Sequence, residues 1–192
     1  MQKKIIIFII CGVLFFAAQG DCTPPLKDRL STDPSVAEVY SQEAAYHYSL
    51  AVLSRLNNDL SGAIDHMKKA LAFQPDSLYL STELVSLYAE HRDVDNALSL
   101  GEAILAKNPG NIELRSILGG LYFNLRKYDK AIREYQTIIE IDPKNLVARL
   151  FLATIYTQEK KYDLAQKAYQ QLLKMDPGNI IGMYYYAKTL TQ

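Results

Sequence analysis

The sequence has few of the residues that build catalytic and metal centres. Tryptophan is absent, and the 192 residues include only three histidines and two cysteines. His47, His66 and His91 are never three or four residues apart, so no two of them could bind a metal from one face of a helix. We therefore expect neither a metal ion nor a cofactor.

The motifs of nucleotide-binding and nucleophilic enzymes are also absent. Gly119 and Gly120 lie inside a repeated pattern, no serine occupies a nucleophile elbow, and Cys22 has no candidate base beside it. Asp93 and Asp95 fall at a predicted turn, where aspartate commonly caps a helix. The sequence favours a protein that is not an enzyme, with an accessory domain of an enzyme as the alternative.

An excess of charge of one sign is missing as well. Lysine and arginine number 21, aspartate and glutamate number 21, and the formal net charge is zero. A protein that binds nucleic acid usually shows a basic patch or stripe. We therefore expect no nucleic-acid partner.

A long apolar run occurs only near the N-terminus. Two lysines precede an uncharged apolar run over residues 5–18, and the small-x-small triplet Ala18-Gln19-Gly20 ends it. This is the order of a secretory signal peptide, and the run is short for a membrane-spanning helix, which needs about 20 apolar residues. We predict that residues 1–20 are a signal peptide and that the protein is exported to the periplasm or envelope of a bacterium. An uncleaved membrane anchor is the alternative.

Cleavage after Gly20 would remove Cys11 and leave Cys22 as a single cysteine, so no intramolecular disulfide could form. A cysteine just after an exported segment is also a candidate for a lipid anchor. Asp21 directly before Cys22 fits a lipoprotein signal poorly. Lipidation of Cys22 is therefore an alternative, and we expect membrane contact only through the N-terminal segment or such an anchor.

A 34-residue period runs through the rest of the chain. Residues 21–35 hold three prolines and are predicted to be a linker, because proline disfavours helix at the residue before it. From residue 36 the pattern is helical with short breaks. The in-phase positions are Pro75, Pro109, Pro143 and Pro177; Ala63, Ala97, Ala131 and Ala165; Leu50, Leu84, Leu118 and Leu152; Ala51, Val85, Gly119 and Ala153; and Tyr88, Tyr122 and Tyr156.

Such a period predicts a stack of helix pairs. In the third unit the two helices are expected over about 112–125 and 128–141, and the small residues suit the close approach of two packed helices. The prediction is an all-α, right-handed solenoid over residues 36–192. Its expected parts are units at about 44–77, 78–111, 112–145 and 146–179, and a terminal helix at 180–192.

The repeats resemble the tetratricopeptide repeat (TPR) family. The third unit carries Leu118-Gly119, Tyr122, Ala131, Tyr135 and Pro143 at the family's spacing, and the fourth carries Leu152-Ala153, Tyr156, Ala165, Tyr169 and Pro177. The resemblance covers about residues 44–192.

The chain departs from the family pattern at the early aromatic position, at the second alanine, which only the first unit has, and at the late aromatic position of the second unit. His47, Ser81, Arg115 and Arg149 replace the early aromatic residue, and Gly101 replaces the late aromatic residue of the second unit. Because glycine in a helix interior costs about 1 kcal/mol relative to alanine, we predict that the second unit is the weakest part of the stack.

The resemblance implies that the first helices of the units line a concave groove that binds a protein or peptide. No Lys/Asn clamp for a C-terminal carboxylate is present at the places where one subclass of the family has it. The positions that correspond to the groove are Tyr48, Val52, Arg55, Tyr79, Thr82, Ser86, Glu90, Glu113, Ser116, Gly120, Phe123, Asn124, Val147, Leu150, Thr154 and Gln158, with Tyr184 and Lys188 extending the row.

The expected function is therefore that of a protein-interaction scaffold that supports the assembly of an envelope complex. One alternative is a self-associating structural element that pairs through the tyrosine-rich C-terminal helix. Another is an adaptor held at the membrane by its uncleaved N-terminus. The tyrosines of the last helix also suit a chain that is part of a longer array.

Overall fold

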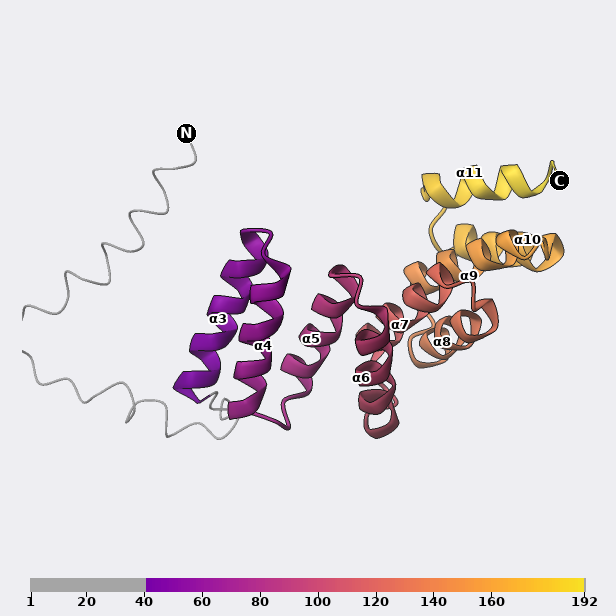
Figure 1. Ribbon diagram of the computed structural model, residues 1–192. Coiled ribbons are helices and arrows are strands. Elements are labelled where there is room, and N and C mark those ends of the chain that lie inside the picture. The colour runs from indigo at the N-terminus through magenta and orange to yellow at the C-terminus, as the bar shows by residue number, and fades with distance from the viewer. Residues whose placement is uncertain (1–40, 192) are drawn as a thin grey trace, which may run out of the picture. The chain divides into compact units, whose positions relative to one another are not determined.

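The computed structural model describes residues 41–191, so the predicted signal peptide, the linker and Cys22 lie outside the described residues. Every regular element within this range is an α-helix (Figure 1). Consecutive helices pack against one another, which confirms the prediction of an all-α solenoid. The helices are α3 (Gln42–Leu56), α4 (Leu60–Phe73), α5 (Leu78–Glu90), α6 (Val94–Lys107), α7 (Ile112–Asn124), α8 (Tyr128–Ile141), α9 (Leu146–Gln158), α10 (Tyr162–Met175) and α11 (Ile180–Thr189).

The breaks between units follow one local design. Each second helix ends two residues before a proline of the 34-residue register, as α8 ends at Ile141 before Pro143. The next first helix then begins after a serine or asparagine whose side chain accepts a backbone N–H three residues on. The residues that cap these helices are Ser77, Asn111, Asn145 and Asn179.

The turn inside each unit carries a further register. Asn58, Arg92, Arg126 and Lys160 are 34 residues apart and have positive φ angles of 64°, 63°, 58° and 59°. The backbone N–H of the following residue then donates to a carbonyl of the first helix, with N–O distances of 2.8–2.9 Å. A left-handed residue at this point reverses the chain between the two helices of the unit.

The small residues of the repeat lie where the helices come closest. Ala63, Ala97, Ala131 and Ala165 have no exposed surface. A Cβ atom on Gly119 would lie 3.0 Å from the ring of Tyr135, so the glycine leaves room for this fully buried tyrosine. The Tyr135 ring in turn stacks on Phe151 of the next unit, with centroids 5.1 Å apart.

Gly101 occupies the register of Tyr135 in the second unit. A Cβ atom there would lie 2.7 Å from a methyl group of Leu118, which is buried. Leu118 of the third unit therefore packs directly on the backbone of α6. The weakness that we predict for this unit remains a prediction, since the leucine fills part of the space that an aromatic residue would occupy.

The described part of the chain ends in the unpaired helix α11, which packs on α10. Its outer side exposes Ile180, Ile181, Met183 and Tyr184. Among the helices of residues 41–191, none combines the length and the apolar character that crossing a bilayer requires.

Candidate interaction surface

The first helices of the units form the candidate surface, which we call the first-helix face (α3, α5, α7 and α9). Between α3 and α5 it contains a hollow of about 620 Å³. Tyr48, Val52, Arg55 and Glu90 of the predicted groove line this hollow. The hydroxyl groups of Tyr48 and Tyr79 are hydrogen-bonded at 2.7 Å beside it. The structure therefore brings five of the predicted residues together.

The charges in this hollow are mostly negative. The Arg55 guanidinium donates to Glu90, with Nε 3.0 Å from Oε2, and its Nη1 lies 3.5 Å from a carboxylate oxygen of Glu83. Burial raises the pKa of Glu83, Arg55 opposes that effect, and the neighbouring carboxylates of Glu113 and Glu90 raise the pKa further. Glu83 and Glu90 thus share one guanidinium, with the carboxylate of Glu113 nearby, and the hollow retains negative charge.

The face continues from α5 to α7. A second hollow of about 400 Å³ is lined there by Glu90, Arg92, Asn124 and apolar residues that include Leu121. Glu113 is exposed, and Ser86 and Ser116 are partly buried. Thr82 is only 3% exposed, and its hydroxyl accepts a hydrogen bond from Asn111. Thr82 therefore belongs to the joint between units and not to the accessible surface.

Beyond α7 the face becomes more apolar. Val147 is 59% exposed, Phe151 is 37% exposed, and Gln158 is exposed at the end of α9.

The other predicted residues of this half differ in exposure. Leu150 packs into the core, and Thr154 donates to the Leu150 carbonyl. Phe123 contacts Tyr128, Gly120 is partly buried, and Tyr184 and Lys188 are exposed on α11. The predicted row is thus acidic at its first half and apolar at its second.

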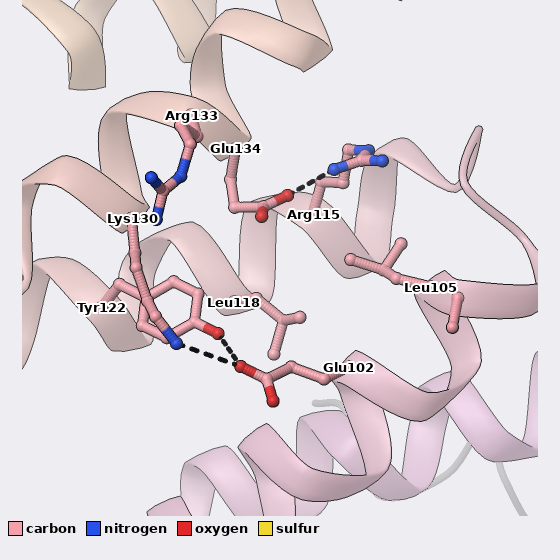
Figure 2. A pocket seen from close by; sticks show the side chains of 9 residues that line it. Glu102, Leu105, Arg115, Leu118, Tyr122, Lys130, Arg133 and Glu134 are labelled. Carbon is pink, nitrogen blue, oxygen red and sulfur yellow. Dashed lines mark hydrogen bonds and ion pairs between the residues drawn. The ribbon is translucent and has the colours of Figure 1, made fainter.

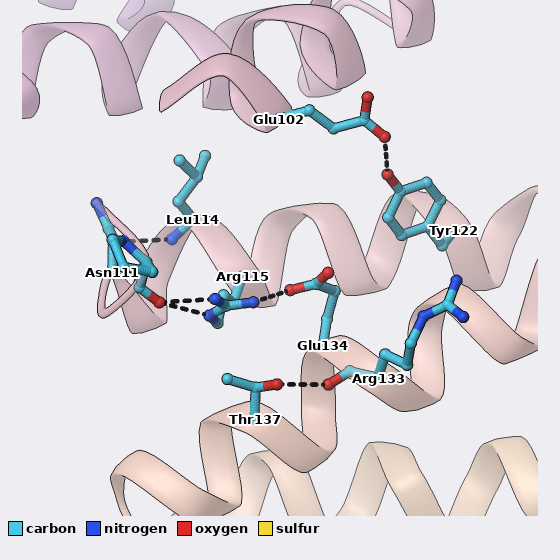
Figure 3. Close-up of polar contacts among 9 residues, drawn as sticks. Glu102, Asn111, Leu114, Arg115, Tyr122, Arg133, Glu134 and Thr137 are labelled. Carbon is cyan, nitrogen blue, oxygen red and sulfur yellow. Dashed lines mark hydrogen bonds and ion pairs between the residues drawn. The ribbon is translucent and has the colours of Figure 1, made fainter. Parts of the chain in front are cut away.

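In the third and fourth units, the arginine at the early aromatic position is hydrogen-bonded to the turn that precedes its helix. Arg115 and Arg149 each donate to the carbonyl of the preceding proline, Pro109 or Pro143, at 2.7 Å. Arg115 also pairs with Glu134 of α8 (Figure 3). The arginines therefore replace packing by an aromatic ring with charged hydrogen bonds.

A further hollow of about 350 Å³ lies where the second unit meets the third (Figure 2). It is lined by residues of α6, α7 and α8, including Glu102, Tyr122, Lys130 and Arg133. Glu102 accepts hydrogen bonds from the Tyr122 hydroxyl and from Lys130. The bond from Tyr122 lowers the pKa of Glu102, whereas burial and the Glu102 carboxylate raise the pKa of Tyr122.

Sequence reasoning missed the hollow between α6, α7 and α8, because its lining comes from three helices with no common spacing. The available signal was the missing aromatic residue at Gly101, which adjoins Leu118 of the lining. Sequence reasoning also missed the pair of His47 and His66, whose Nδ1 atoms are 3.4 Å apart across α3 and α4. Among the described residues, no group of three His, Cys, Asp or Glu side chains is placed to hold a metal.

Comparisons with known proteins agree with this architecture. The model of a tetratricopeptide repeat family matches residues 88–150 and 126–183, which together span half of the chain. No curated protein matches the sequence.

Solved structures share the fold at low sequence identity. MamA from Desulfovibrio magneticus is 13% identical with a TM-score of 0.72, and the match covers 79% of this chain and 86% of that one. A TPR protein from Parabacteroides merdae is 19% identical with a TM-score of 0.71, covering 76% of this chain and 58% of that one. YrrB, described as a TPR protein with an unusual peptide-binding site, is 18% identical with a TM-score of 0.65, covering 74% of this chain and 73% of that one. The family match and the architecture agree: the chain belongs to the tetratricopeptide repeat family.

Proposed function

We propose that this protein is an interaction scaffold that holds a segment of a partner protein on its first-helix face. The observation that carries the proposal is the pair of hollows that follow one another along α3, α5 and α7. Hollows lined by aromatic and apolar groups with a few placed charges suit an extended peptide or a helix. The peptide-binding site named for the similar protein YrrB supports the same role.

The partner segment carries a basic side chain together with apolar ones. Glu83, Glu90 and Glu113 leave the first half of the face negative, and a lysine or arginine of the partner would reduce the repulsion among them. The exposed side chains of Val147 and Phe151 would bury the apolar part.

Site-specific photocrosslinking in cells tests this proposal. A photoreactive residue at Val52 or Phe123 should capture one discrete partner, and a control at the exposed Lys174 of α10 should not. Capture of a discrete partner from Lys174, with only diffuse products from Val52 and Phe123, would show that the first-helix face is not the binding surface.

The setting that we propose is a complex of the bacterial envelope. The proposal rests on the signal-like order of the first 20 residues. The intact mass and N-terminal sequence of the protein from fractionated cells would test it. A chain that starts at Asp21 in the periplasm supports export with cleavage, an acylated Cys22 supports the lipid anchor, and an unprocessed chain in the cytosol contradicts export.

Self-association is a second candidate role, and the exposed side chains of Ile180, Ile181 and Tyr184 on α11 favour it. A second copy covering α11 would remove this apolar surface from water. Sedimentation velocity at several concentrations distinguishes the two roles. A protein that stays monomeric throughout is a scaffold without self-association.

A further inference from the structure

We propose that the joint between the second and third units carries a second binding site, separate from the first-helix face, which takes an acidic segment of a partner protein. The site is the 350 Å³ hollow between α6, α7 and α8. None of the residues of the predicted groove lines this hollow, so a segment bound here would be held by other side chains.

An unpaired cation, Arg133, lies at the hollow. Among residues 41–191 the guanidinium of Arg133 makes no hydrogen bond or ion pair, and Figure 2 shows it on the same side of the hollow as the Lys130 ammonium. The two carboxylates of the lining already have partners. Glu102 accepts from Tyr122 and Lys130, and Glu134 accepts from Arg115. Arg133 is therefore the group that remains available to an incoming anion.

The positive charge continues beyond the hollow. A neighbouring hollow of about 390 Å³ shares Lys130 and Arg133 with the first and adds Arg126 and Lys127. Of the two acids in its lining, Glu159 is paired with Lys161, and Asp129 is the other. Two adjoining hollows with unpaired cations suit a segment that carries more than one carboxylate.

The neighbouring units of the repeat lack most of these charged residues. One unit later, the positions of Glu102, Lys130, Arg133 and Glu134 are occupied by Gln136, Leu164, Lys167 and Ala168. One unit earlier they are Lys68, Asn96, Ser99 and Leu100. Lys68 and Lys167 keep one cation each, but neither neighbouring unit repeats the two acids Glu102 and Glu134 or the pair of cations Lys130 and Arg133, so the packing of the repeat does not require this set of charges.

The chemistry of the lining identifies the ligand. Guanidinium groups bind carboxylates through two parallel hydrogen bonds, so the available guanidinium of Arg133 suits the carboxylate of an aspartate or glutamate side chain. A nucleic-acid backbone would meet Glu102, Asp129 and Glu134 on the same surface, and their repulsion disfavours a continuous row of phosphates. Isolated aspartate or glutamate side chains of a protein segment fit the alternation of charges.

Fluorescence anisotropy of the full chain tests the site. The probe is a labelled peptide with paired glutamates, and its glutamine analogue is the reference. Arg133→Glu should weaken binding of the glutamate peptide roughly tenfold or more, because the receiving cation becomes a repelling anion. Lys174→Glu makes the same change of charge at an exposed residue of α10 and should leave binding within about twofold of the parent. A lysine analogue of the peptide should bind Arg133→Glu better than it binds the parent.

Other outcomes overturn the proposal. Equal losses in Arg133→Glu and Lys174→Glu would reduce the effect to net charge, and equal binding of the glutamate and glutamine peptides would remove the role of carboxylates. Arg133-dependent binding of a single-stranded oligonucleotide or of phosphatidylglycerol vesicles, without binding of the peptide, would assign the patch to a different ligand. Circular dichroism of Arg133→Glu checks that the exposed substitution leaves the helices intact. Crosslinking from Phe123 should not change in this variant, so the two proposals fail independently.

Discussion

Arg115 shows how one residue can replace an aromatic ring in this repeat. Two atoms of its guanidinium donate to the Pro109 carbonyl, and a third nitrogen pairs with Glu134. Its side chain is only 14% exposed, so water screens these bonds little. The arginine thereby connects the turn before α7 to the second helix of the same unit.

Arg115→Ala should therefore lower the free energy of unfolding by about 1–3 kcal/mol, the range for a hydrogen bond to a charged group with one partner left in place. Urea denaturation followed by circular dichroism measures the change. The exposed Lys144→Ala is the control and should stay within about 0.5 kcal/mol of the parent. A loss in Arg115→Ala no larger than that of the control would show that the bonds to Pro109 and Glu134 do not stabilise the fold.

Glu83 gives a prediction with a defined dependence on pH. Its pKa is raised in the folded state, first by burial, so the folded protein holds this proton more tightly than the unfolded chain. Ionisation of Glu83 thus disfavours folding as the pH rises from the ordinary value of 4.5 through the raised one. Thermal or urea unfolding between about pH 4 and pH 7 should show Glu83→Gln gaining stability relative to the parent as the pH increases. The opposite trend would mean that Arg55 dominates the environment of Glu83.

At the scale of the helix, the units differ in how their second helices begin. Asp59 and Asp93 precede α4 and α6, and each accepts a backbone N–H from the first turn. Lys127 and Lys161 precede α8 and α10 with similar backbone angles and make no such bond. The last two units therefore leave a helix terminus without the side-chain cap that the first two have.

Lys161→Asp should raise the free energy of unfolding by about 0.5–2 kcal/mol, because the aspartate restores this cap and places a negative charge at the N-terminus of α10. Chemical denaturation measures the gain. Lys161→Ala is the matched control, since it removes the Lys161–Glu159 ion pair without adding a cap. An equal change in both variants would exclude capping as the cause.

The helices were predictable because their boundaries depend on local chemistry. The sequence predicts helices at about 112–125 and 128–141, and the structure has Ile112–Asn124 and Tyr128–Ile141. Proline and the small residues of the repeat carry this information in the chain itself. The left-handed residues were not predictable in the same way, since Arg92, Arg126 and Lys160 are not residue types that favour positive φ.

The candidate sites were less predictable, because they depend on contacts between distant residues. Arg55 pairs with Glu83 and Glu90, which are 28 and 35 residues away, and nothing in a 34-residue spacing specifies which side chains will meet. Thr82 has the spacing of a groove residue, yet it is buried between two units, where its hydroxyl accepts a hydrogen bond from Asn111. Spacing therefore assigns a residue to a helix face but does not settle its exposure or its ionic partners.

At the scale of the molecule, stability is distributed over neighbouring units. One buried cluster extends from Ala51 to Ile155, and a second includes Ala153, Tyr169 and Leu172 in the last described helices. In an array, each unit is stabilised mainly by the units next to it. A substitution or residue that destabilises one unit should therefore lower the stability of the helices of that unit first.

Gly101 is the local weakness that we expect. Its position inside α6 costs about 1 kcal/mol relative to alanine, so amides of α6 should exchange with solvent about fivefold faster than those of α8. Native-state hydrogen exchange resolved by residue measures the ratio. Equal protection of α6 and α8 would mean that packing of Leu118 against Gly101 fully offsets the missing aromatic ring.

The tyrosine register has a consequence for how such an array can change in evolution. Tyr88 lies 5.6 Å from the Lys68 ammonium, Tyr122 donates to the Glu102 carboxylate, and Tyr156 accepts from the Gln136 amide at 3.4 Å. The tyrosine at this position of the repeat therefore contacts a cation, an anion or a neutral amide of the preceding helix, depending on the unit. Recombination that exchanged two units would bring each tyrosine against the wrong neighbour unless the preceding helix moved with it. An exchange of units that keeps these contacts would therefore have to include the second helix that precedes each tyrosine.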